Sequence, residues 1–201
     1  MSDEESVLDT DDVREVLEEF SLELGDRLDA HDIERVITGD KDDLTSADLG
    51  TRPESFTENH LIYPLLEAAG LEYEPRPFGQ SGGRAVWPDF ELTNVEAHTI
   101  GEDKPLNNVG EAIPEIKEYL DRKSIDAEYG IATDGIEWYI YRIELGGDFT
   151  EYPEITKVDL RSALIEIARD TGVVSSTSVV DVDVEEVLEE FVSVFDHPRL
   201  E

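Results

Sequence analysis

The sequence predicts an α/β fold in which a short mixed sheet is flanked by helices, with further helices at both ends of the chain. Three observations predict this class. Apolar residues recur at helical spacing near both ends, four short apolar stretches typical of strands lie in the middle, and a Thr133-Asp134-Gly135 turn joins two of these stretches. Asp-Gly between two apolar runs is a strong hairpin signal.

The first part of the chain has a helical pattern. Residues 11–24 and 29–38 carry apolar residues at helical spacing, and each stretch is followed by a glycine, Gly25 or Gly39. Residues 39–52 are polar and rich in turn-forming residues, so we expect a loop or linker there.

A third helix is predicted over residues 58–69, with Thr57 as its N-cap and Gly70 after its end. Pro64 complicates this prediction because proline removes a helical hydrogen bond. We therefore expect Pro64 either in the first turns of a helix that begins nearer Leu61 or at a kink.

The middle of the chain alternates strands and a helix. Strands are predicted at 84–93 and 96–104, a helix at 108–122, and two more strands at 127–132 and 136–143. This order predicts a sheet with at least one helix packed on it.

Two further helices are predicted at residues 158–171 and 183–195. The last one repeats the pattern Val-x-Glu-Val-Leu-Glu-Glu-Phe of the first helix, with the second valine at Val16 and Val187. We interpret the likeness as two amphipathic helices built from the same preferred residues, which pack against each other or against a partner.

The chain divides into three regions. We expect N-terminal helices over 1–52, a core over 53–150 and C-terminal helices over 151–201, which together form one compact domain at this length of 201 residues. The sequence contains neither G-x-G-x-x-G nor G-x-x-x-x-G-K-[ST], so no nucleotide-binding loop is predicted.

Composition points to a salt-adapted protein. Acids make up 51 of 201 residues, the net charge is −35 and the pI is about 4.1. The acids are spread along the chain and the apolar residues remain periodic, which distinguishes the chain from a disordered acidic tract. We infer a halophilic source in which molar salt screens the self-repulsion. The alternative is an acidic protein that mimics DNA.

Cysteine is absent, so disulfides and thiolate metal sites are excluded. No segment approaches 18 consecutive apolar residues, and the first five residues, which include three acids, have no apolar run behind them. We therefore expect a soluble, cytoplasmic protein without membrane association.

The residues with the clearest chemistry are Asp89, Glu102 and Lys104. Asp89 lies in an apolar stretch, and Glu102-Asp103-Lys104 follows on the next predicted strand. Side chains alternate along a strand, so Glu102 and Lys104 share a face while Asp103 points away. Carboxylates hold Mg²⁺, and an ammonium beside them favours an anionic transition state. The alternatives are a solvent-facing Asp89 and a surface ion pair between Glu102 and Lys104.

Four blocks of the sequence resemble the PD-(D/E)XK nuclease superfamily, which has the restriction-endonuclease-like fold. They are residues 58–66, 87–90, 102–105 and 130–141, and the likeness covers roughly residues 55–145. Within the superfamily, the blocks look like the N-terminal nuclease domain of type I restriction subunits and of fused restriction–modification enzymes. The family's core order of helix, three strands, helix and strand matches the predicted order.

The resemblance implies a role for each matching residue. Asp89 would be the central metal ligand, Glu102 the second carboxylate ligand, and Lys104 the residue that orients or activates the attacking water. Glu58, at the start of the helix before them, would be a third acidic group beside the metal; its alternative is a favourable interaction with the helix dipole. The chain departs from the family's pattern at three positions: Gly101, Asp103 and Glu115.

We therefore expect a DNA endonuclease or nuclease domain of a restriction or defence system, dependent on Mg²⁺ or Mn²⁺. Its partners would be DNA and a methyltransferase or translocase subunit. Residues 73–88 hold one acid and two bases, which makes this segment the least anionic one near Asp89. The alternative is a catalytically inactive nuclease-like module that binds a partner subunit.

Overall fold

The computed structural model describes residues 10–76, 87–146, 149–175 and 182–195. The helices are α1 (Thr10–Gly25), α2 (Ala30–Thr38), α3 (Ser46–Leu49), α4 (Pro53–Thr57), the π-helical segment η1 (Glu58–Ile62), α5 (Tyr63–Ala68), α6 (Val109–Leu120), α7 (Arg161–Asp170) and α8 (Val184–Ser193). The strands are β1 (Tyr73–Pro75), β2 (Phe90–Leu92), β3 (Thr99–Asp103), β4 (Tyr129–Thr133), β5 (Glu137–Arg142), β6 (Glu144–Gly146), β7 (Phe149–Glu151) and β8 (Glu154–Asp159). None of these helices combines the length and the apolar character that crossing a membrane requires.

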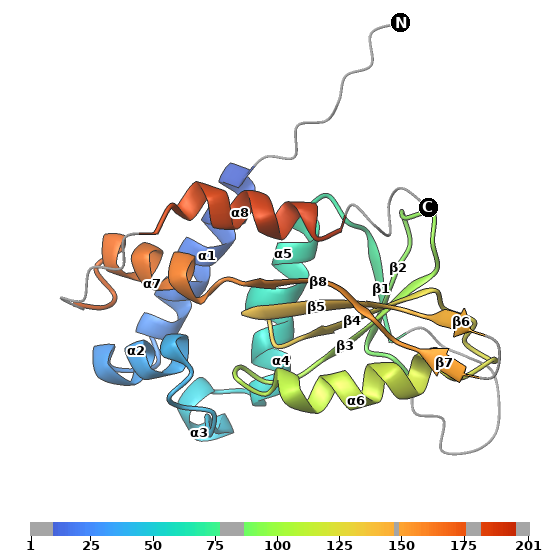
Figure 1. Cartoon of the computed structure of the whole chain (residues 1–201). Helices are drawn as coiled ribbons and strands as arrows, with labels where there is room; N and C mark the ends of the chain where they lie inside the picture. Colours follow the sequence, from blue (N-terminus) through green and yellow to red (C-terminus); the bar gives the residue numbers. More distant parts are fainter. Residues whose placement is uncertain (1–9, 77–86, 147–148, 176–181, 196–201) are drawn as a thin grey trace, which may run out of the picture.

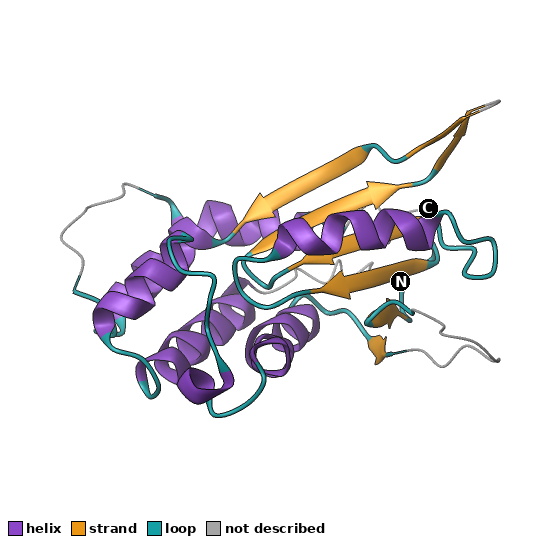
Figure 2. Cartoon of the chain, turned by 90° about the horizontal axis from the view of Figure 1, so that it is seen from below, coloured by secondary structure: helices purple, strands orange, loops and turns teal. Residues whose placement is uncertain are grey.

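The α/β class is confirmed. A six-stranded mixed sheet has the order β1-β2-β3-β4-β5-β8, and β6 pairs with β7 in a separate ribbon. β3 and β4 are parallel, and the other neighbouring pairs are antiparallel. Helix α6 makes the crossover that a parallel pair requires. It lies along one face of the sheet, whereas α1, α5 and α8 lie on the other side (Figures 1 and 2).

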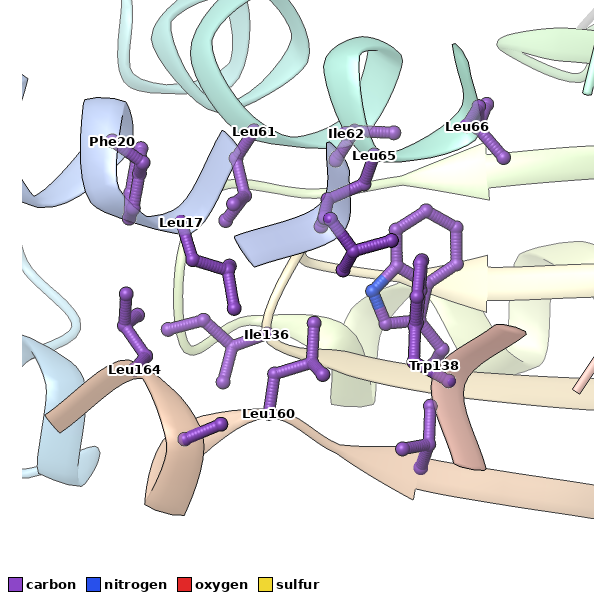
Figure 3. Close-up of a cluster of buried hydrophobic side chains, with 14 of the residues drawn as sticks. Leu17, Phe20, Leu61, Ile62, Leu65, Leu66, Ile136, Trp138, Leu160 and Leu164 are labelled. Carbon is purple, nitrogen blue, oxygen red and sulfur yellow. The ribbon is translucent and has the colours of Figure 1, made fainter. Parts of the chain in front are cut away.

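The larger hydrophobic core lies between the sheet and the α1, α5, α7 and α8 helices. In Figure 3, side chains of α1 and of the η1–α5 segment converge on Trp138 and Ile136. Trp138 is fully buried and packs edge-on against Phe191 and Phe195, so it belongs to this core. A smaller apolar cluster fills the space between the sheet and α6.

The terminal helices pack against each other, as one interpretation of their shared pattern predicted. Thr10 Oγ1 donates to Glu185 Oε2 at 3.1 Å, and Arg14 forms an ion pair with the same carboxylate. α8 also contacts α7 and β8, so it packs against both the neighbouring helices and the edge strand of the sheet. The helices predicted at 11–24, 29–38 and 108–122 are present with boundaries shifted by a residue or two.

The predicted N-cap at Thr57 is wrong. The helix begins at Pro53, where a proline needs no hydrogen bond from its nitrogen, and Thr57 lies inside it with its hydroxyl bonded to the Pro53 carbonyl. Pro64 has no N–H and cannot donate the usual helical hydrogen bond to the carbonyl four residues back. The π-helical segment η1 directly before it uses hydrogen bonds that span five residues, as from the Tyr63 N–H to the Glu58 carbonyl, and so accommodates the proline.

The strand boundaries also differ from the prediction. The stretch predicted at 84–93 forms only the three-residue β2 within its described part, and residues 84–86 lie outside the described residues. Neither β1 nor β8 was predicted, and β8 occupies the start of the helix expected at 158–171, which begins instead at Arg161. β3 runs through Gly101, where the Phe90 ring fills the space that a side chain would need.

Candidate active site

Asp89 is held at the end of the sheet by its own backbone. Its N–H donates to the Gly101 carbonyl at 2.8 Å, and its carbonyl accepts from the Arg76 N–H at 2.6 Å. The register pairs Phe90 with Gly101, so Asp89 lies across from Glu102. One carboxylate oxygen of Asp89 accepts the Asp103 N–H at 3.1 Å. Asp89 is therefore fixed beside the last residues of β3, and it is half-buried rather than turned to solvent.

Glu102 and Lys104 form a buried pair at the same end of β3. Lys104 Nζ lies 2.6 Å from Glu102 Oε1 and 3.0 Å from Glu115 Oε2 on α6. The Glu102 residue is only 3% exposed, so the alternative of a surface ion pair is wrong. The alternation of β3 places Ile100 and Glu102 on the face covered by α6, and this is why the helix supplies the second carboxylate.

The crowding of acids around Glu102 favours a proton or a cation shared between their carboxyl groups. Burial, contact with Glu115 and the charge of Asp89 raise the pKa of Glu102 to about 9. Burial alone would lower the pKa of Lys104, but its contacts with Glu102 and Glu115 outweigh burial and raise it. Lys104 is thus a stable ammonium, which can donate hydrogen bonds and balance negative charge but cannot accept a proton.

Asp103 points to the opposite face, as strand alternation predicted. One carboxylate oxygen from each of Glu54, Glu58 and Asp103 lies within 4.8 Å of the others. Arg76 contacts two of these acids, with Nη2 at 3.1 Å from Glu58 Oε1 and 3.4 Å from Glu54 Oε1. Burial and the charge of Asp89 raise the pKa of Asp103 to about 8, and burial, opposed by Arg76, raises the pKa of Glu58.

Three buried carboxylate oxygens of the described residues in this region lack a hydrogen-bond donor. Glu102 Oε2 and both carboxylate oxygens of Asp103 have no hydrogen-bond partner among the described residues. Burying such an atom without a partner costs free energy, and a bound cation or a proton removes that cost. Hard oxygen ligands of this kind suit Mg²⁺ or Mn²⁺. The residues present therefore fit a divalent metal.

The four residues singled out from the sequence come to one end of the sheet, on two faces of β3. Asp89, Glu102 and Lys104 lie where β2 and β3 meet α6, whereas Glu58 lies with Glu54 and Asp103 on the other face. Whether they bind metal stays a prediction. His98 lies elsewhere: its ring nitrogens are 3.1 Å from the Asp126 carbonyl and 3.2 Å from a Glu91 oxygen.

Sequence reasoning missed two partners of this site. Glu115 stood out as a departure from the family's pattern, but not as a partner of Lys104. Glu54 is four residues before Glu58 and therefore on the same helical face. It was overlooked because the helix was expected to begin at 58 rather than at Pro53.

A curated protein of Methanocaldococcus jannaschii is similar to this chain. It carries the provisional name of a type II restriction enzyme and methyltransferase, and it is 35% identical over 99 residues, which are 45% of this chain and 8% of that protein. The chain thus spans a small part of its relative's length. No family model matches the chain, and no solved structure matches it.

Proposed function

We propose that this chain is a metal-dependent deoxyribonuclease of the PD-(D/E)XK superfamily that acts in a restriction or defence system. The observation that carries the proposal is the convergence of Asp89, Glu102 and Lys104 at one end of the β2–β3 pair, with Glu102 buried. The similarity to a restriction enzyme and methyltransferase supports the same reaction class. DNA is the proposed substrate, and a methyltransferase or translocase subunit the proposed partner.

In this proposal Asp89 and Glu102 hold Mg²⁺ or Mn²⁺, and Glu58 is a third acidic ligand that approaches from the helical layer. The charge of Asp89 contributes to the raised pKa of Glu58, so the two carboxylates belong to one electrostatic group. The metal would neutralise charge on the phosphodiester and lower the pKa of a bound water. Glu102 would have to give up its proton to hold the metal, because a carboxylate ligand must be ionised.

Lys104 acts as a positioned cation. Its ammonium is held by Glu102 and Glu115, and its raised pKa keeps it charged at neutral pH. It can orient the attacking water by donating a hydrogen bond and can stabilise the charge that develops on phosphate oxygens. Glu115 fixes the ammonium in place, so its removal is expected to weaken positioning more than metal binding.

Cleavage of supercoiled plasmid DNA tests the proposal. With Mg²⁺ in concentrated KCl, we expect Asp89→Asn and Lys104→Ala each to abolish cleavage while the circular dichroism spectrum stays unchanged. Asp43→Asn and Lys41→Ala are matched controls, because these two residues lie apart from the site and pair with each other. Cleavage retained by both site variants would refute the assignment.

The alternative is a nuclease-like module without activity that binds a partner subunit. Isothermal titration with Mn²⁺ separates the two functions. Loss of a bound Mn²⁺ in Asp89→Asn supports the metal-dependent enzyme. A wild-type chain that neither binds Mn²⁺ nor cleaves DNA supports the accessory module instead.

A further inference from the structure

The acidic cluster on the helical face of β3 is built from two separate elements. Glu54 lies in the first turn of α4 and Glu58 begins η1, so the continuous helix stacks their side chains on one face. Asp103 is the last residue of β3. Oxygens of the three carboxylates lie within 4.8 Å of one another. Like charges at this separation repel unless a cation or a proton lies among them.

Asp103 provides the second, independent observation. It is 1% exposed, and neither of its carboxylate oxygens has a hydrogen-bond partner among the described residues. Arg76 contacts Glu54 and Glu58 from the solvent side, where its own side chain is 54% exposed. Neither carboxylate oxygen of Asp103 accepts a hydrogen bond from Arg76. Within the described part of the chain, the buried carboxylate therefore lacks the donor that its burial requires.

The spacing suits a hard divalent cation. Two oxygens bound to one Mg²⁺ lie at most about 4.2 Å apart, and two bound to one Ca²⁺ at most about 5 Å apart. The observed limit of 4.8 Å admits a Ca²⁺-sized ion as it stands and Mg²⁺ or Mn²⁺ after a contraction of less than about 1 Å. Three carboxylates and added water ligands complete such a site.

We propose that Glu54, Glu58 and Asp103 form a second divalent-cation site, separate from the Asp89–Glu102 site on the α6 face. Asp103 is its central ligand. Glu58 can serve both sites because a carboxylate has two oxygens. The second cation ties the α4–η1 helix to the end of β3. Because its ligands Glu54 and Asp103 belong to no other proposed site, it does not depend on the proposed hydrolysis of DNA.

Counting bound ions tests this site. In isothermal titration of the full chain with Mn²⁺, we expect two ions for the wild type and one for both Asp103→Asn and Asp103→Leu. Glu111→Gln removes an exposed acid on α6 and should leave both ions bound, which controls for loose binding to the acidic surface. If both Asp103 variants bind as many ions as the wild type, the second site does not exist.

Thermal unfolding shows whether the Asp103 variants fold and gives a second test of the site. Without metal, Asp103→Leu should unfold at a higher temperature than the wild type, because it replaces an unpartnered buried carboxylate with an apolar side chain. Adding Mn²⁺ should raise the unfolding temperature of Asp103→Leu less than that of the wild type. An equal rise in the two proteins would overturn the proposal.

The same titration tests the two proposed metal sites independently of each other. If Asp103→Asn loses one ion and Asp89→Asn loses none, the second site stands and the metal-dependent hydrolase does not. If Asp89→Asn loses one ion and Asp103→Asn none, the reverse holds.

Discussion

At the scale of single residues, Glu102 determines the chemistry of the site. Its carboxyl lies between one ammonium and two further acids, Asp89 and Glu115, and is nearly excluded from solvent. A free carboxylate there is costly because Lys104 is shared with Glu115. The raised pKa of Glu102 favours a proton on its carboxyl at neutral pH, and a metal at the proposed site would have to displace that proton.

This proton makes the stability of the metal-free protein depend on pH. The pKa of Glu102 is about 9 in the folded chain against an ordinary value of 4.5, and that of Asp103 is about 8 against 3.8. At any pH between the ordinary pKa of these acids and their pKa in the folded chain, the folded state binds more protons than the unfolded state. The free energy of unfolding therefore falls as pH rises through this range. The stabilisation that comes from protonating these two acids is complete below about pH 4 and is lost by about pH 9.

We expect Glu102→Gln to reduce the fall in stability with rising pH, because glutamine does not titrate. Urea unfolding with a chelator present, at several values between about pH 5 and about pH 9, measures the slope for the wild type and the variant. Glu111→Gln is exposed and should keep the wild-type slope. A wild-type protein that becomes more stable as pH rises through this window would contradict the raised pKa of both acids.

At the scale of secondary-structure elements, the site depends on the close pairing of β2 with β3. A Cβ at Gly101 would lie 2.0 Å from the Phe90 Cζ atom, so the phenyl ring occupies the space of the missing side chain. This contact lets Phe90 fill the core beneath the strand that carries Glu102 and Asp103. Gly101 departs from the family's pattern, but it is the residue that permits this close pairing.

Gly101→Ala is expected to destabilise the protein by about 1–3 kcal/mol, because the new methyl group overpacks against a buried ring. DNA cleavage should fall as well, since β3 must shift relative to Asp89. Gly110→Ala is the matched control: nothing lies within 4 Å of its Cβ, and alanine favours the helix by about 0.5–1 kcal/mol. Thermal unfolding of the two variants compares them directly. Equal stabilities would show that the strands adjust without strain.

The sequence predicted some elements well and others poorly, for physical reasons. The α1 and α6 helices were evident because each buries one continuous apolar stripe. β1 has three residues, of which two are exposed, so it carries no hydrophobic pattern. Alternation along β3 predicted that Glu102 and Lys104 share a face. The proximity of Glu115 and Glu54 depends on how helices pack on the sheet, which a local pattern does not contain.

At the scale of the whole molecule, the excess of acids over lysines and arginines is the main feature of the surface chemistry. The net charge is −35, and many of the described arginines are already engaged with acids, as in the pairs of Arg14, Arg27 and Arg161. With 16 lysines and arginines in total, at most 16 of the 51 acids can have a cation that they do not share. In concentrated salt, counterion release would contribute little to the proposed affinity for DNA, so metal and hydrogen bonds would have to contribute more.

The inferred halophilic origin predicts that salt stabilises the fold. Raising KCl from about 0.1 M to about 1 M shortens the Debye length from about 10 Å to about 3 Å and screens repulsion between surface acids. The free energy of unfolding should therefore rise with KCl. Glu15 and Glu19 are exposed on α1 four residues apart, where like charges destabilise a helix. The double variant Glu15→Gln/Glu19→Gln should be more stable than the wild type at low salt and gain less from KCl. Urea unfolding at several KCl concentrations measures both effects, and a wild-type chain equally stable at low and high KCl would refute the salt adaptation.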